Sequence, residues 1–124
     1  MSRFLLLAIS GALGTLGRYL LSGSLHALFG AQFPYGTFVV NVLGCFVIGF
    51  LGTLVDEKYF LASDFRMAVF IGFLGAFTTF SSFAYETWML FKAGEFFFAA
   101  CNVFGSLILC FAGLLIGVLF ARLF

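Results

Sequence analysis

The sequence predicts an all-α membrane protein with four transmembrane helices, because its composition is strongly apolar and its hydrophobic residues fall in four long segments. Of its 124 residues, 64% are hydrophobic and 9% are charged, and the mean hydropathy is +1.21. A soluble domain is typically about a quarter charged, so this chain lacks the residues for a water-compatible surface. The length favours one domain, residues 1–124, and the net charge of +1 gives no indication of nucleic-acid binding.

Four segments are expected to cross the bilayer as helices. A helix needs roughly 20 residues to span the hydrocarbon, and backbone groups in lipid must be hydrogen-bonded within the segment. The predicted spans are residues 4–22, 35–55, 67–91 and 96–121. The start of the chain, MSRFLLLAISGALG, resembles a secretory signal peptide in its basic and apolar regions. Because the apolar character continues beyond Gly17, we favour a first transmembrane helix.

The first two spans carry glycine, arginine and proline at informative positions. Gly11, Gly14 and Gly17 recur at every third residue, which predicts close packing against another helix. Arg18 lies near the end of its span and either snorkels to the headgroups or lines a water-filled vestibule that attracts anions. Pro34 suits the first turn of the second helix, where a missing N–H has little cost.

The third span contains the motif GFLGAFTTFSSF at residues 72–83. Counted from Arg66 at the helical rise, Gly75 lies about 14 Å deep and Thr78 about 18 Å deep, close to the bilayer midplane. Glycine and β-branched threonine are poor helix formers, so we expect a break in the helix here. The carbonyls freed by such a break would suit a hard cation such as Na⁺.

Aromatic rings and hydrogen-bond donors follow this expected break. Phe80 and Phe83 lie one turn apart and share a helix face, and the edges of their rings carry partial positive charge. The candidate donors within the spans are Thr79, Ser81, Ser82, Asn41, Asn102 and Ser106. Donors of this kind suit a small, hard anion, whereas a plain packing helix remains the alternative interpretation.

The chain has few residues for enzymatic or metal chemistry. Cys45, Cys101 and Cys110 lie inside apolar spans without metal-ligand spacing, so we interpret them as small packing residues. The single histidine, His26, is expected in the first loop without partners. No nucleophile–base set, carboxylate pair or phosphate-binding loop is recognisable in the sequence, so we do not expect an enzyme.

The basic residues indicate orientation only weakly. One side of the predicted membrane protein carries Arg3, Lys58, Arg66 and Arg122, and the other carries Arg18 and Lys92. This bias favours a single orientation only slightly and leaves insertion in both orientations open. Four thin, glycine-rich helices enclose little interior, so an oligomer is expected. The connections also look short: Ser63 or Asp64 is a candidate cap for the third helix, and Lys92–Glu95 reads as a tight turn.

The chain resembles the Fluc (CrcB) family of fluoride channels over essentially its whole length. The strings GALGTLGRYLLS, PYGTFVVNVLGCFVIG and above all GFLGAFTTFSSFAYE carry the resemblance. It implies a passive multi-pass channel of the cell membrane that exports F⁻ from the cytoplasm and protects against fluoride toxicity. It also implies that two subunits insert antiparallel, as a dual-topology homodimer in the lipid bilayer with two fluoride pores.

The resemblance further implies roles for individual residues. Phe80 and Phe83 match the pore-facing phenylalanine pair, Asn41 matches a fluoride donor, and Arg18 matches a vestibule residue. The main-chain carbonyls of Gly75 and Thr78 from both subunits would hold one structural Na⁺ at the dimer centre. The residues expected along or near the polar path are Thr79, Ser81, Ser82, Glu86, Asn102 and Ser106. Asn102 stands where some members have a tyrosine, and Cys110 stands where some have a hydroxyl.

Two other functions are compatible with four short spans. A dual-topology cation exporter of the small multidrug resistance type would need a membrane-embedded carboxylate in its first helix, where this chain has Arg18 instead. A non-transporting subunit of a membrane assembly is the second alternative, and purified protein in liposomes would then move no ion.

Overall fold

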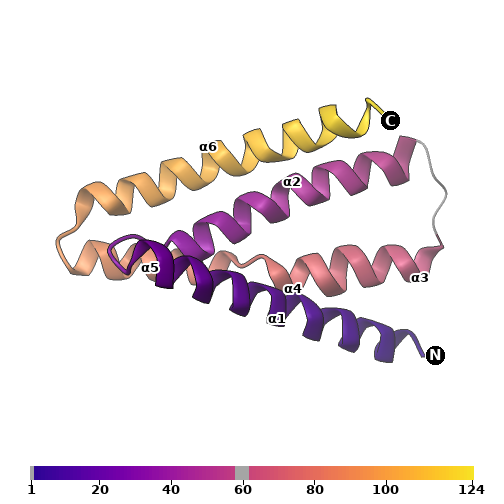
Figure 1. Cartoon of the computed structure of the whole chain (residues 1–124), viewed down its shortest axis with the longest axis horizontal. Coiled ribbons are helices and arrows are strands. Elements are labelled where there is room, and N and C mark those ends of the chain that lie inside the picture. Colours follow the sequence, from indigo (N-terminus) through magenta and orange to yellow (C-terminus); the bar gives the residue numbers. More distant parts are fainter. Residues whose placement is uncertain (1, 58–61) are drawn as a thin grey trace.

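The chain folds into four long helical spans that run alternately up and down (Figure 1). The computed structural model describes residues 2–57 and 62–124. Its elements are α1 (Arg3–Phe29), α2 (Tyr35–Glu57), α3 (Ser63–Arg66), the π-helix η1 (Met67–Leu74), α4 (Gly75–Phe77), α5 (Phe80–Lys92) and α6 (Phe96–Ala121). Within the described residues, four spans are long and apolar enough to cross a membrane, and the third joins α3, η1, α4 and α5. The predicted all-α fold with four such spans is confirmed.

The first helix extends well past the segment predicted to cross the membrane. It begins after Ser2, whose side chain caps it by accepting a hydrogen bond from the Leu5 N–H, and it ends at Gly30. Gly30 has a φ of 82°, a left-handed conformation that favours glycine and terminates helices. His26 therefore lies in the last turn of α1, and its expected place in a loop was wrong. The residues after Ser22 are less apolar, but they contain no proline that would stop the helix.

The connections around the third span differ from the prediction at one end. The residue that caps α3 is Ala62, which offers no side-chain hydrogen bond, so the proposed cap by Ser63 or Asp64 was wrong. The Asp64 carboxylate instead forms an ion pair with Arg3, with 2.7 Å between Oδ1 of Asp64 and Nε of Arg3. At the other end, α5 turns into α6 through Gly94, whose φ is 77°, and the predicted tight turn is confirmed.

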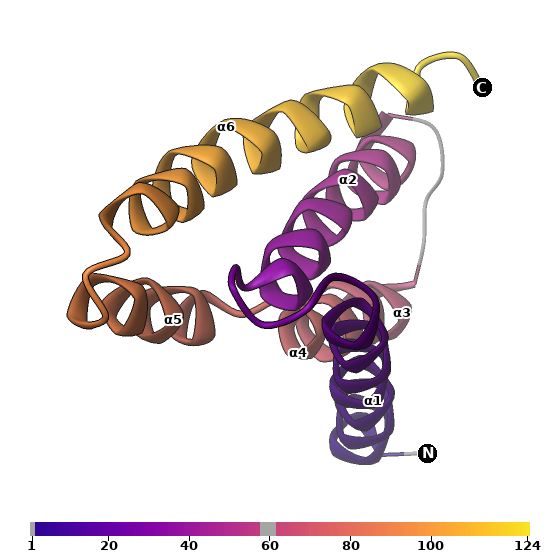
Figure 2. The same cartoon turned by 60° about the vertical axis from the view of Figure 1, so that its left-hand side comes forward.

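The spans pack in two parallel pairs, α1 beside the third span and α2 beside α6 (Figures 1 and 2). Glycines allow the close contact in both pairs. A Cβ atom added to Gly14 would overlap the backbone of Phe73, and one added to Gly117 would overlap the backbone of Phe46. The predicted role of glycine in helix packing is confirmed at Gly14, and Gly117 plays the same part between α6 and α2.

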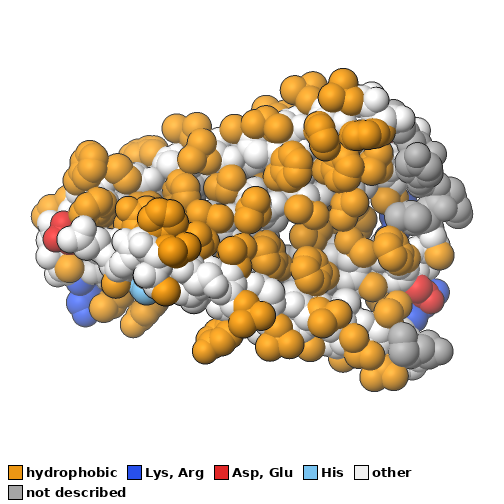
Figure 3. All heavy atoms as spheres, in the orientation of Figure 1, with side chains coloured by type: hydrophobic (Ala, Val, Ile, Leu, Met, Phe, Trp, Pro, Cys, Tyr) orange, Lys and Arg blue, Asp and Glu red, His pale blue; other side chains and the backbone are white. Residues whose placement is uncertain are grey.

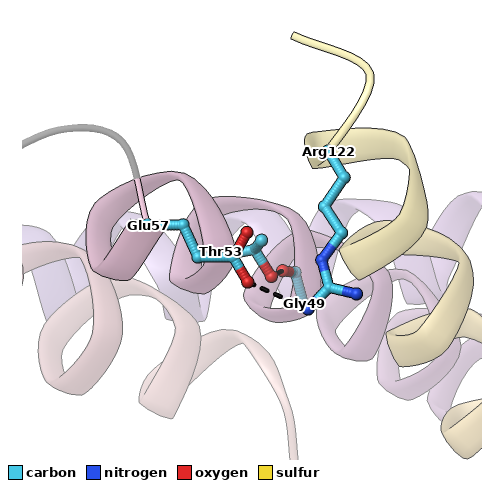
Figure 4. A network of polar contacts seen from close by, with 4 residues as sticks. All are labelled: Gly49, Thr53, Glu57 and Arg122. Carbon is cyan, nitrogen blue, oxygen red and sulfur yellow. Dashed lines mark hydrogen bonds and ion pairs between the residues drawn. The ribbon is translucent and has the colours of Figure 1, made fainter.

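The charged side chains gather at the two ends of an otherwise apolar surface (Figure 3). At the end that holds both termini, Arg66 pairs with Asp56 and Arg122 pairs with Glu57, each at 2.9 Å. Figure 4 shows Arg122 reaching from α6 to Glu57 on α2. These pairs fix the relative position of neighbouring spans at the membrane boundary, although each is exposed and contributes little stability by itself.

Candidate functional site

The centre of the third span contains two residues in an extended conformation, Thr78 and Thr79. Thr78 has φ and ψ of −83° and 158°, and Thr79 has −154° and 117°. Gly75, three residues earlier, has helical angles of −63° and −33°. The non-helical conformation therefore begins at the threonines, where β-branching disfavours the helix, and not at the glycine.

Asn41 of α2 binds both backbone groups of Thr79. Its Oδ1 accepts a hydrogen bond from the Thr79 N–H at 2.8 Å, and its Nδ2 donates one to the Thr79 carbonyl at 3.0 Å. A polar backbone group that is left unpaired at membrane depth is costly. Asn41 is thus the partner that makes the extended conformation at Thr79 stable, while the second N–H of its Nδ2 is not used in this contact.

The threonine hydroxyls complete the local hydrogen bonding. The Thr78 hydroxyl donates to the Leu74 carbonyl at 2.9 Å. The Thr79 hydroxyl caps α5, because its Oγ1 accepts a hydrogen bond from the Ser82 N–H at 3.2 Å. The same hydroxyl lies 3.1 Å from the Ser82 hydroxyl and 3.3 Å from that of Ser81. Three hydroxyls therefore cluster at the start of α5.

The carbonyls of Gly75 and Thr78 are not used by this network. In the described part of the chain, no hydrogen bond outside regular helix ends on either oxygen. The residues that would normally donate to them are diverted, since the Thr79 N–H goes to Asn41 and the Ser82 N–H goes to the Thr79 side chain. Two hard oxygen atoms are thus left available near the middle of the span.

A cavity of about 360 Å³ lies beside these residues. Phe80 and Phe83 form part of its wall, with ring centroids 5.4 Å apart and planes inclined by 46°. Its other polar or thiol-bearing lining residues are Asn41, Cys45, Thr78, Thr79, Ser106 and Cys110. The Ser106 Oγ is buried and has no hydrogen-bond partner among the described residues. This cavity combines two aromatic rings with an unpaired hydroxyl in an apolar setting.

A second cavity, of about 550 Å³, lies on the other side of Thr79. Arg18, Tyr19 and His26 of α1 line it together with Thr37, Ser82 and Thr79. Thr79 lines both cavities and Ser82 lines the second, whereas Ser81 is among the lining residues of neither. Arg18 therefore lines a cavity with polar walls together with His26, and its vestibule role stays a prediction.

Two further polar contacts join α5 to its neighbours. The Thr37 hydroxyl donates to Oε1 of Glu86 at 2.7 Å, while Oε2 of Glu86 is buried without a partner among the described residues. Asn102, which is 1% exposed, donates to the Thr87 hydroxyl at 2.9 Å. This hydrogen bond braces α6 against α5. Asn102 is among the lining residues of neither cavity and lies apart from the cavity walls.

The structure brings together most of the residues that the sequence singled out. Asn41, Gly75, Thr78, Thr79, Phe80, Phe83 and Ser106 share the first cavity, and Arg18 and Ser82 share the second with Thr79. Sequence reasoning missed Thr37, Cys45 and Thr87. The sequence contained a signal for Thr37 and Cys45. Together with Asn41 they recur at four-residue spacing, so all three lie on one face of α2.

Comparison with known proteins decides the family. Residues 5–118 match the family described as CrcB-like protein, Camphor Resistance (CrcB). The chain belongs to the CrcB family. A relative in Geobacter sulfurreducens, named fluoride-specific ion channel FluC, is 45% identical over 98% of both chains. Relatives with the same name in Solibacter usitatus and Geobacter metallireducens are 45% and 46% identical, over 97% and 94% of this chain and 98% and 94% of their own.

The CrcB relatives bear on the alternatives left open by the sequence. They align over nearly the whole chain, so the aligned region includes the residues that line both cavities. A family of ion channels is neither a family of enzymes nor one of multidrug exporters. The described residues include no group of three acidic, histidine or cysteine side chains that could hold a metal ion.

Proposed function

We propose that this chain forms a passive, fluoride-selective channel that lets F⁻ leave the cytoplasm and so protects the cell from fluoride. The observation that carries the proposal is the cavity in which Phe80, Phe83 and Ser106 meet the extended threonines, in a chain whose relatives are named fluoride-specific ion channels. The hydrophobic spans support a place in the cell membrane as a multi-pass protein.

The physical need for such a channel follows from weak-acid chemistry. Hydrogen fluoride crosses a bilayer as a neutral molecule and ionises in a near-neutral cytoplasm, which traps the anion inside. A membrane potential that is negative inside drives F⁻ outward with about 2.3 kcal/mol per 100 mV. A selective pore is therefore sufficient for export, and no coupled energy source is required.

The arrangement of donors supports a path for a small anion. Arg18 lines the wider cavity and favours the entry of negative charge. Thr79 and Ser82 then offer hydroxyls where the two cavities meet. Beyond them, the Phe80 and Phe83 ring edges and the unpaired Ser106 hydroxyl replace part of the lost water shell. This replacement is essential, because burying an unpaired ion in a low-dielectric medium costs tens of kcal/mol.

We further propose that two copies of the chain associate antiparallel, with two pores per dimer. Phe80 is 77% exposed in the single chain, and the 360 Å³ cavity is bordered by residues of the third span, α2 and α6 only. A second copy on this face would close the cavity and cover Phe80. The weak positive-inside bias of the sequence is compatible with insertion in both orientations.

The proposal includes a structural Na⁺ held by the extended segment, which acts as a functional break in the third helix. The carbonyls of Gly75 and Thr78 are hard oxygen ligands, the kind that Na⁺ prefers. Among the described residues, neither oxygen accepts a hydrogen bond outside regular helix. Two carbonyls from each subunit would give four ligands at the two-fold axis. The ion would supply positive charge and cohesion at the centre of the dimer, while the chain's own side chains carry the anion.

Purified protein in liposomes tests the proposed function. We expect rapid F⁻ efflux, read with a fluoride electrode, and chloride efflux close to the protein-free background in parallel vesicles. Replacing Na⁺ with a large organic cation during purification is expected to reduce the flux or the dimer content. Chloride movement as fast as fluoride movement would contradict selectivity, and absence of any flux would favour the non-transporting assembly subunit.

A further inference from the structure

Two of the three cysteines, on different helices, face the same cavity. Cys45 of α2 and Cys110 of α6 both line the 360 Å³ cavity, and both are free, partly exposed thiols. The third cysteine, Cys101, is also a free thiol on α6 but is not among the lining residues. The chain thus has one cysteine pair in the cavity wall and one cysteine outside it.

The packing of α2 on α6 sets the two thiols opposite each other. The helices run parallel, and the Glu57–Arg122 pair joins residues 65 positions apart in the sequence (Figure 4). Gly49 and Leu114 are also 65 positions apart in the sequence. They are in such close contact that a Cβ on Gly49 would overlap the Leu114 backbone. Cys45 lies one helical turn before Gly49, and Cys110 lies one turn before Leu114. The two cysteines therefore occupy matching positions on the parallel helices.

We propose that Cys45 and Cys110 together form a binding site for a soft, thiophilic metal ion that accepts two ligands, such as Hg²⁺. Soft metals prefer thiolate ligands, and the thiol must lose its proton to bind. Each thiol therefore releases one proton to water as its sulfur–metal bond forms. The described residues place no third histidine, cysteine or acidic ligand beside the pair, which favours a two-coordinate ion over tetrahedral zinc.

Occupation of this site has a consequence for the anion path. The pair shares its cavity with Phe80, Phe83 and Ser106, so an ion bridging the sulfurs stands in the path and ties α2 to α6. We expect it to block conduction. The block rests on the proposed function, whereas metal binding by the two thiols does not.

Metal retention and fluoride flux are measured on the same detergent-purified, full-length protein. The probe is Hg²⁺ added in stoichiometric amount and then challenged with a monothiol competitor, with the bound metal read by intact-protein mass spectrometry. The variants are Cys45→Ser, Cys110→Ser and the matched control Cys101→Ser on the same helix as Cys110. Alanine at each position provides a second set of variants if a serine variant is not monodisperse. Flux with Hg²⁺ is normalised to each variant's own flux without it.

We expect wild type and Cys101→Ser to retain one Hg²⁺ per chain, with a mass increase of one mercury less two protons. Loss of either pair member removes the second ligand, whose effective concentration makes the two-ligand complex roughly a hundredfold or more tighter. Equal retention by Cys45→Ser or Cys110→Ser, or loss of retention in Cys101→Ser, would overturn the site. Retention by the pair in a protein that conducts no fluoride even without Hg²⁺ would support the site and contradict the proposed function.

Discussion

At the scale of single residues, Asn41 connects the sequence to the unusual backbone of the third span. Its depth in the second helix was predictable by counting residues along the chain. Its partner was not, because the contact with Thr79 joins residues 38 positions apart and depends on how two helices pack. The sequence indicated a donor for an anion; the structure adds that the amide binds both backbone groups of Thr79, which leaves the second N–H of Nδ2 for the donor role.

Removing the Asn41 side chain is expected to destabilise the extended segment. Asn41→Ala leaves the Thr79 N–H and carbonyl without partners, at about 1–3 kcal/mol for each group. We expect a lower melting temperature and a reduced F⁻ flux. Thr53→Ala is the matched control, since the Thr53 hydroxyl bonds only to the Gly49 carbonyl of its own helix (Figure 4). Wild-type stability in Asn41→Ala would show that Thr79 does not depend on this amide.

At the scale of elements, hydropathy was sufficient to predict the four spans, because each is long and nearly free of charge. It could not predict the π-helix η1 or the residues at which α4 ends and α5 begins, since these depend on tertiary contacts. Gly44 illustrates such a contact. A Cβ at Gly44 would overlap the Thr78 side chain, so this glycine provides the space that the first extended residue occupies. The cysteine pair was missed for the same reason, because the sequence alone does not give the register of α2 on α6.

A methyl group at Gly44 is therefore expected to disturb the extended segment from the opposite helix. Gly44→Ala pushes against Thr78, and overpacking of this kind typically costs about 1–3 kcal/mol. We expect lower thermal stability together with reduced flux. Gly52→Ala on the same helix is the control, because nothing lies within 4 Å of an added Cβ there, and alanine favours a helix over glycine. Equal behaviour of the two variants would contradict the assigned role of Gly44.

At the scale of the whole molecule, the proposed antiparallel dimer is supported by the exposed face around Phe80 and is compatible with the distribution of charge. The described basic residues at the end with both termini are Arg3, Arg66 and Arg122, and each is paired with an acidic residue. The positive-inside signal of the sequence is weak because Lys and Arg at this end outnumber those at the other end only slightly. Lys58, which the sequence assigns to the same end, lies outside the described residues. The assembly could be anticipated from the family resemblance and remains a prediction.

Topology reporters test this assembly. C-terminal fusions to two reporters, each active in one compartment only, are expected to give signal on both sides of the membrane. Adding lysines to the segment between the second and third spans should bias insertion toward one orientation. Function should then fall, because oppositely oriented partners become scarce, and co-expression with a variant biased the other way should restore it. A wild type that reports one orientation and still conducts would rule out the antiparallel dimer.

The most direct test of the central claim is F⁻ efflux from liposomes containing the double variant Phe80→Ile/Phe83→Ile, with dimer content measured by size-exclusion chromatography. Isoleucine keeps the apolar bulk and removes the ring edges that we propose contact the anion. If each ring contributes about 1 kcal/mol to passage, the double variant should conduct at least roughly thirtyfold more slowly, while eluting like wild type. Wild-type flux in a monodisperse double variant would contradict the claim that these two rings carry fluoride through the membrane.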